Sequence, residues 1–177
     1  MNDTSAPLIL TLAVDDASFA RVDELRRLHF PPERNLIPAH LTLFHHLPGG
    51  EHEGEVAGVV GDACRMYRPM TLRVTGLRFM GRGVAYTLES PELARLRGLL
   101  AEAWFGWLTG QDRQKFRPHV TVQNKVEPEV ARALHERLSA GFAPFEVEGR
   151  GLLLWRYRGG PWEQVGEYPF VGATGGG

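Results

Sequence analysis

The chain has 177 residues and a formal net charge of −1, with 43 % hydrophobic and 23 % charged residues. This composition is typical of a globular protein, and it excludes a disordered, collagen-like or coiled-coil chain. The charge balance lacks the basic excess that is usual in proteins that bind long nucleic acids through their phosphates. The length favours a single domain.

The N-terminal segment and the cysteine content indicate the compartment. No stretch approaches the ~18 apolar residues of a membrane span. The first apolar stretch, 8–14, follows polar residues, whereas a signal peptide places a basic segment before it. Cys64 is the only cysteine, so an intramolecular disulfide is impossible. We expect a cytoplasmic protein without membrane contact, and a monomer, because nothing in the sequence indicates an obligate protein partner.

The hydrophobic pattern predicts alternating strands and helices. Short apolar runs between turn residues predict strands, and apolar residues at every third or fourth position predict helices. In chain order we predict a strand at 8–14, a helix after Asp15, a strand at 39–47, a helix at 53–67, an extended segment at 70–80, a strand at 84–88, a helix from Pro91, a strand at 119–126, a helix from Pro128, and a hairpin of 145–157 with 162–170.

The predicted elements repeat along the chain. Segments 8–14 and 84–88 are the first strands of two similar halves, and segments 39–47 and 119–126 are the second strands. Each half continues with a helix and a further strand. The repeat lies in the pattern of elements, because the two halves share little sequence.

This repeat predicts an internally duplicated, bilobal α+β fold. Two antiparallel sheets would face each other across a central cleft, with the helices on the outside. We expect one domain over residues 1–171, with lobes of roughly 7–80 and 81–171, followed by a flexible tail at 172–177.

One tetrapeptide form occurs in both second strands, at positions 79 residues apart. The two copies are His40-Leu41-Thr42-Leu43 and His119-Val120-Thr121-Val122. Successive side chains of a strand point to opposite faces, so the His and Thr of each copy share one face and the aliphatic residues share the other. If the two halves are related by a two-fold axis, the two His-Thr pairs face each other across the cleft.

Two imidazoles and two hydroxyls around one small site suit an anionic phosphodiester. An imidazole changes its charge near neutral pH, so one histidine can take a proton from a nucleophile while the other gives a proton to a leaving oxygen. The hydroxyls can donate to the non-bridging phosphoryl oxygens. We therefore predict His40, His119, Thr42 and Thr121 as catalytic residues.

Four further side chains are candidate substrate contacts. Strict alternation would place Phe44 and His46 on the face of the first His-Thr pair, and His45 on the opposite face. Phe44 could stack on a base or pack in the core, and His46 could contact the phosphate. Arg117 and Lys125 are candidates for a phosphate or ribose contact, with a solvated surface charge as the alternative.

The paired motifs, their separation and the segment Phe116-Arg-Pro-His119 resemble the two-histidine (2H) phosphoesterases, in particular the bacterial 2′-5′ RNA ligase-like proteins. The resemblance covers nearly the whole chain. It implies the bilobal fold and the cofactor-free, metal-independent hydrolysis of 2′,3′-cyclic phosphates of nucleotides or RNA ends to 2′-phosphates. In some members it also implies reversible 2′-5′ RNA joining. By this resemblance His119 is the base and His40 the acid.

Two other classes of function compete with this hypothesis. One is a nucleotide- or RNA-end-binding module without catalysis, although mere binding needs no titratable pair. The other is a metal hydrolase with zinc on His40, His46 and His119, although no Asp, Glu or Cys stands beside them at ligand spacing.

Overall fold

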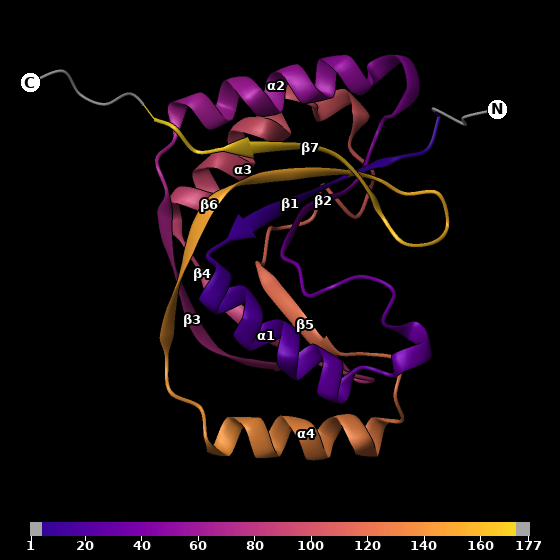
Figure 1. The fold of residues 1–177 in the computed structure, drawn as a ribbon, viewed down its shortest axis with the longest axis vertical. Helices are drawn as coiled ribbons and strands as arrows, with labels where there is room; N and C mark the ends of the chain where they lie inside the picture. Colours follow the sequence, from indigo (N-terminus) through magenta and orange to yellow (C-terminus); the bar gives the residue numbers. More distant parts are fainter. Residues whose placement is uncertain (1–4, 173–177) are drawn as a thin grey trace, which may run out of the picture.

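A computed structural model describes residues 5–172 (Figure 1). The order of elements confirms the predicted alternation. The strands are β1 (Leu8–Val14), β2 (Thr42–Leu47), β3 (Met70–Phe79), β4 (Val84–Glu89), β5 (His119–Gln123), β6 (Phe145–Arg156) and β7 (Glu163–Pro169), and the helices are α1 (Asp16–His29), α2 (Glu53–Met66), α3 (Pro91–Ala103) and α4 (Pro128–Ala140), with 3-10 turns at Pro32–Arg34, Gly50–His52 and Phe105–Trp107.

Local sequence signals begin helices α1 and α3 and the central hairpin. The Asp15 carboxylate accepts the Ser18 N–H at 3.0 Å, and the Ser90 hydroxyl accepts the Leu93 N–H at 3.2 Å. These side chains satisfy N–H groups that a helix start leaves without partners. Between β3 and β4, Gly81 has a φ of 83°, a backbone conformation that favours glycine.

All seven strands belong to one antiparallel sheet, in the order β2-β1-β6-β3-β4-β5, with β7 paired to β6. The sheet is continuous because β6 is 12 residues long. Its residues 145–149 pair with β3, residues 149–156 pair with β1, and residues 151–156 pair with β7. The α+β class is therefore confirmed, and the two predicted sheets are the two ends of one curled sheet (Figure 1).

The sheet order also shows the duplication. The order β2-β1-β6 at one end corresponds to β5-β4-β3 at the other, so each first strand lies between the second strand of its own repeat and the third strand of the other repeat. Each end of the sheet thus contains strands from both repeats. The predicted boundary near residue 80 separates the repeats along the chain rather than the two ends of the sheet.

Helices of one repeat also pack on strands of the other repeat. Helix α1, from the first repeat, packs on β5 of the second repeat, while α4 packs on β3 and β4. Helix α2 packs on β6 and β7 and against α3. Figure 1 shows α2 and α3 together at one end of the molecule and α4 at the other.

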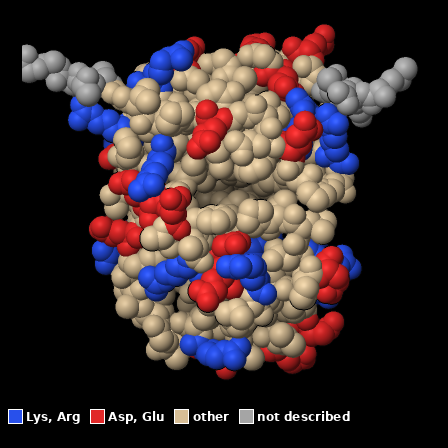
Figure 2. Space-filling model, viewed as in Figure 1, with Lys and Arg blue, Asp and Glu red and all other residues tan. Residues whose placement is uncertain are grey.

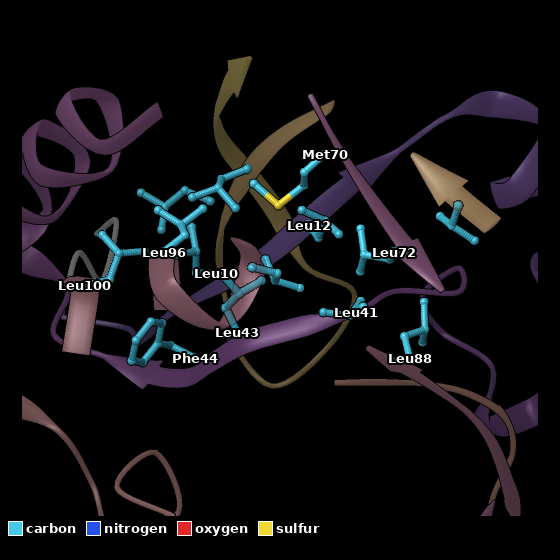
Figure 3. Close-up of a cluster of buried hydrophobic side chains, with 14 of the residues drawn as sticks. Leu10, Leu12, Leu41, Leu43, Phe44, Met70, Leu72, Leu88, Leu96 and Leu100 are labelled. Atoms are coloured by element: carbon cyan, nitrogen blue, oxygen red, sulfur yellow. The ribbon is translucent and has the colours of Figure 1, made fainter. Parts of the chain in front are cut away.

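One hydrophobic core joins the two ends of the sheet. Figure 3 shows how it extends from Leu96 and Leu100 of α3, past Leu10 of β1, to Leu72 of β3 and Leu88 of β4. Burying a leucine side chain contributes about 1.5–3 kcal/mol. The strands that carry the two motifs are thus fixed to a common core.

Two further features concern the C-terminal end of the described chain and the character of the helices. The N–H of Gly172 donates to the Tyr67 carbonyl at 2.8 Å, and the rest of the predicted tail, 173–177, lies outside the described residues. Within residues 5–172, no helix combines the length and the apolar character needed to cross a bilayer.

Candidate active site

The first motif lies where β2 begins. The Ala39 N–H donates to the Asp23 carboxylate and the Leu12 N–H donates to the Leu41 carbonyl, both at 2.9 Å. Ala39 is therefore held by a side chain of α1 rather than by a neighbouring strand. The strand predicted from residue 39 begins only at Thr42, which pairs with Thr11 of β1.

The second motif begins β5. His119 pairs with Thr87 of β4, and Thr121 pairs with Ala85. The strand ends at Gln123 instead of continuing to residue 126. The reason is local, because Lys125 has a φ of 62°, which a β-strand does not accommodate.

The two motif histidines make the same hydrogen bond. His40 Nδ1 lies 2.9 Å from the Pro38 carbonyl oxygen, and His119 Nδ1 lies 2.9 Å from the Arg117 carbonyl oxygen. A carbonyl oxygen only accepts, so each Nδ1 carries a proton and donates it. Each ring therefore leaves its Nε2 available for proton transfer, because the hydrogen bond at one ring nitrogen sets the tautomer.

Residues of both motifs line one cavity, although His40 lines a second one. A cavity of about 470 Å³ is lined by Thr42 from the first motif and by His119 from the second. Met80 lines the same cavity, and its sulfur lies 3.9 Å from the Thr121 hydroxyl oxygen. The structure therefore brings residues of both repeats to a common site.

The His119 side of this site carries positive charge. Arg78, Lys115 and Arg117 line the same cavity and are exposed. Arg117 was a predicted contact, and its carbonyl also fixes the ring of His119. These side chains make this cavity suitable for an anion, and the Asp112 carboxylate, which also lines it, is buried.

The His40 side is apolar and aromatic. A second cavity, of about 400 Å³, is lined by His40 together with Ile37, Val120, Trp155 and Trp162. The ring centroids of His40 and Trp162 are 4.7 Å apart, and the Trp155 indole N–H donates to the Thr11 hydroxyl at 2.8 Å. Figure 2 shows a hollow near the middle of the molecule, in surface that carries few charged side chains.

Burial controls the protonation of His40. Removal from water lowers the pKa of its imidazole to about 4, although the hydrogen bond to the Pro38 carbonyl acts in the opposite direction. The positive charges of Arg26, His119 and His45 lower this pKa further. His40 is thus neutral at pH 7, and its unprotonated Nε2 can act only as an acceptor.

Of the two alternatives for Phe44, the structure confirms packing in the core and not stacking on a base. Its side chain is fully buried, with its ring centroid 5.1 Å from that of Trp104 and 4.1 Å from the guanidinium carbon of Arg97. One step along β1, from Leu10 to Thr11, corresponds to two steps along β2. This bulge interrupts the alternation of side chains between the two faces of β2, so that the Phe44 side chain points into the core.

The same irregularity exchanges the expected places of His45 and His46. Both side chains are exposed, but His45, predicted to face away, lines the cavity that contains Thr42, whereas His46 lines neither of the two cavities described above. Asp112 holds both residues, because its buried carboxylate accepts their main-chain N–H groups at 2.9 Å. Asp112 also lies 3.1 Å from His45 Nδ1. Sequence reasoning missed it, because it is one polar residue in a polar loop.

Two other sequence hypotheses have different outcomes. Lys125 is exposed and lines neither cavity, so its role as a substrate contact stays a prediction. The alternative zinc set of His40, His46 and His119 is not assembled. Among the residues that the structure describes, no three His, Cys, Asp or Glu side chains are grouped so that they could hold a metal ion.

Comparison with protein families now identifies the class. The model of the 2′-5′ RNA ligase superfamily matches residues 14–161. The chain therefore belongs to this superfamily of 2H phosphoesterases, which confirms the predicted resemblance and supports a phosphoesterase or ligase-like activity. No curated protein matches the sequence.

Solved structures share the fold. TT0787 of Thermus thermophilus superposes with a TM-score of 0.67 at 18 % identity, covering 94 % of this chain and 98 % of its own. Escherichia coli LigT, complexed with 3′-AMP, gives a TM-score of 0.63 at 18 % identity, covering 94 % of this chain and 99 % of its own. A structure described as a phosphoesterase gives 0.61 at 18 % identity, with 94 % and 98 % covered. At these identities the likeness establishes the fold alone.

Proposed function

We propose that the protein hydrolyses 2′,3′-cyclic phosphates of nucleotides or RNA ends to 2′-phosphates, by metal-independent catalysis with His40 and His119. The observation that carries this proposal is the matched hydrogen bond of the two rings, each with Nδ1 on a carbonyl 2.9 Å away and with no partner for Nε2 among residues 5–172. An acid-base pair needs two such nitrogens on one substrate. Catalysis therefore explains the pair better than binding alone does.

The relatives support a nucleotide as the substrate class. E. coli LigT has been crystallised with 3′-AMP, with NADP+ and with ATP. The two cavities suit such a molecule. The aromatic cavity beside His40 would hold the base, and the basic side beside His119 would hold phosphates or a continuing chain.

In the proposed reaction, water attacks phosphorus opposite the ribose 3′ oxygen. His119 takes the water proton as the new P–O bond forms. The bond between phosphorus and the 3′ oxygen breaks, and His40 gives its proton to that oxygen, so the product is a 2′-phosphate and a free 3′-hydroxyl. The Thr42 and Thr121 hydroxyls donate to the non-bridging oxygens, where negative charge accumulates.

The same geometry allows 2′-5′ joining. If a 5′-hydroxyl of a second RNA end takes the place of water, the same bond to the 3′ oxygen breaks and a 2′-5′ phosphodiester forms. His119 then removes the hydroxyl proton instead of a water proton. Ligation and hydrolysis would thus use the same residues in the same roles.

As the acid, His40 must gain a proton before it can give one. Its pKa of about 4 in the ligand-free protein means that it lacks this proton at pH 7. An anionic phosphodiester stabilises the imidazolium and raises this pKa, so the proton is taken up together with the substrate. By linkage, the anion binds more tightly as the pH falls towards 4, by up to about tenfold per pH unit for one proton.

We expect NMR of the histidine rings to detect this uptake, with inorganic sulfate as the probe because its charge does not change in this range. At pH 5.5 the His40 ring should give the signals of a neutral imidazole without sulfate and of an imidazolium at saturating sulfate. The spectrum of His40→Ala assigns the signals. A His40 ring that stays neutral when sulfate binds would contradict the acid role.

Turnover of a 2′,3′-cyclic mononucleotide, with and without EDTA, tests the proposed function. We expect a 2′-phosphate product at the same rate in both conditions. Turnover that EDTA abolishes would indicate a metal hydrolase. Binding of the nucleotide without turnover would indicate the non-catalytic module, and a 3′-phosphate product would contradict the proposed bond cleavage.

A further inference from the structure

Two arginines are buried beside the motifs, in equivalent helices of the two repeats. Arg26 of α1 is 4 % exposed and Arg97 of α3 is 9 % exposed. Each helix follows the first strand of its repeat. A guanidinium remains charged in proteins, so each buried charge requires polar partners.

Arg26 reaches the second motif. Its Nη1 donates to the main-chain carbonyl of Thr121 at 3.0 Å, and its Nε donates to the Asn35 side-chain oxygen at 2.8 Å. Its guanidinium carbon lies 4.2 Å from the ring centroid of Phe30. Arg26 of the first repeat is therefore fixed on three sides while it holds the catalytic strand of the second repeat.

Arg97 reaches the first motif. Its Nε donates to the main-chain carbonyl of Leu43 at 3.2 Å, and its Nη2 donates to the Asp112 carbonyl at 2.6 Å. Leu43 follows Thr42 directly, and the Asp112 carboxylate in turn accepts the N–H groups of residues 45 and 46. Arg97 of the second repeat thus holds the catalytic strand of the first repeat and the loop that leads to the second motif.

The two arginines form a reciprocal arrangement. Each comes from one repeat and binds a main-chain carbonyl in the His-Thr motif of the other repeat. We propose that Arg26 and Arg97 are positioning residues, a crosswise pair of latches that fixes the two His-Thr motifs relative to each other. This inference rests on the proposed function, since it assigns the latches to the geometry of that site.

Catalysis depends on such positioning, because a displacement of about 1 Å can cost about 10²-fold in rate. Lysine preserves the charge of each arginine but lacks the fork that binds two acceptors at once. We expect Arg26→Lys and Arg97→Lys each to lower kcat by about 10- to 100-fold, with KM for the cyclic mononucleotide little changed. The pH profile should also stay unchanged, because Arg26→Lys keeps the positive charge that acts on His40.

Arg156→Lys is the matched control. Arg156 is 13 % exposed and binds the carboxylate of Glu53 through Nε and Nη2, at 3.2 and 2.6 Å, and that of Glu163 at 3.1 Å. Like Arg26 and Arg97, Arg156 donates to two acceptor groups at once, but its acceptors are carboxylates and neither belongs to a motif. We expect this variant to lose stability without a fall in kcat.

Amide hydrogen exchange tests the latches without using activity. Arg26→Lys should make the segment 119–123 exchange about tenfold faster, and Arg97→Lys the segment 42–47, as expected from the loss of one hydrogen bond to a charged group. Asn35→Ala, a milder change that frees Nε of Arg26, should affect 119–123 in the same direction. Arg156→Lys should affect neither segment.

The outcomes separate the latches from the proposed function. Faster exchange of 119–123 in Arg26→Lys and of 42–47 in Arg97→Lys, together with a lower kcat, supports the inference. Exchange that rises across the whole chain, or an unchanged kcat in both lysine variants of an active enzyme, would overturn it. A wild-type protein that does not turn over cyclic phosphates would overturn the proposed function, and the exchange pattern would then decide whether the latches hold the motifs.

Discussion

Replacing either His40 or His119 with alanine should lower the turnover of a 2′,3′-cyclic mononucleotide by about 10²–10⁴-fold, the usual contribution of one acid or base. The reason is that each ring offers one free Nε2, and the reaction needs both a group that takes a proton and a group that gives one. Steady-state kinetics on the purified variants measures the effect.

Both variants should remain folded. Each motif histidine lies at the edge of a cavity, and its hydrogen bond to a neighbouring carbonyl spans two residues, so its loss leaves the core intact. His135→Ala is the matched control, because His135 lies on α4 with its ring 6.1 Å from that of Phe79. Wild-type rates in either motif variant would refute the two-histidine mechanism.

Replacing Thr42 or Thr121 with valine should lower kcat by about 10- to 10³-fold, which is comparable to the loss of one donor to a developing oxyanion. Valine keeps the branched shape of threonine and favours a strand, so the change removes the hydroxyl alone. Within the described residues, the hydroxyl of Thr121 has the Met80 sulfur, 3.9 Å away, as its hydrogen-bond partner, so stability should change little.

Thr71→Val provides the control for these two variants. Thr71 is an exposed strand residue of β3 that pairs with Glu148, and it lines neither cavity of the site. Its kcat should equal that of the wild type. If Thr42→Val and Thr121→Val also matched the wild type, the threonines would have a structural role only.

The sequence predicted those parts of the site that depend on local pattern. The His-Thr motifs could be recognised because strand alternation puts both polar side chains on one face, and because the form occurs twice at corresponding places. The repeat predicted the duplicated fold for the same reason. Alternation fails at Phe44, where the pairing of β1 with β2 introduces a bulge that the sequence of β2 alone does not indicate.

The buried arginines show a second limit. In α1 the apolar Leu28 is 69 % exposed, whereas the charged Arg26 is buried. Arg26 stands four residues after buried Val22, and Arg97 four after buried Leu93. A charged residue at the spacing of the apolar stripe was therefore a usable signal. The partner of Arg26 was not predictable, because Thr121, whose carbonyl it binds, lies 95 positions away in the sequence.

The acid and base roles themselves can be tested by changing the leaving group. A 3′-deoxynucleoside 2′-(p-nitrophenyl phosphate) replaces the ribose 3′ oxygen with p-nitrophenolate, which leaves without a proton. Hydrolysis of this ester therefore needs the base but not the acid.

Comparing the two histidine variants on this ester and on the cyclic mononucleotide tests the central claim most directly. We predict that His40→Ala hydrolyses the aryl ester at nearly the wild-type rate while it remains inactive on the cyclic substrate. His119→Ala should be inactive on both. Recovery in His119→Ala alone would contradict the assigned roles, and equal loss in both variants on both substrates would contradict an acid-base pair.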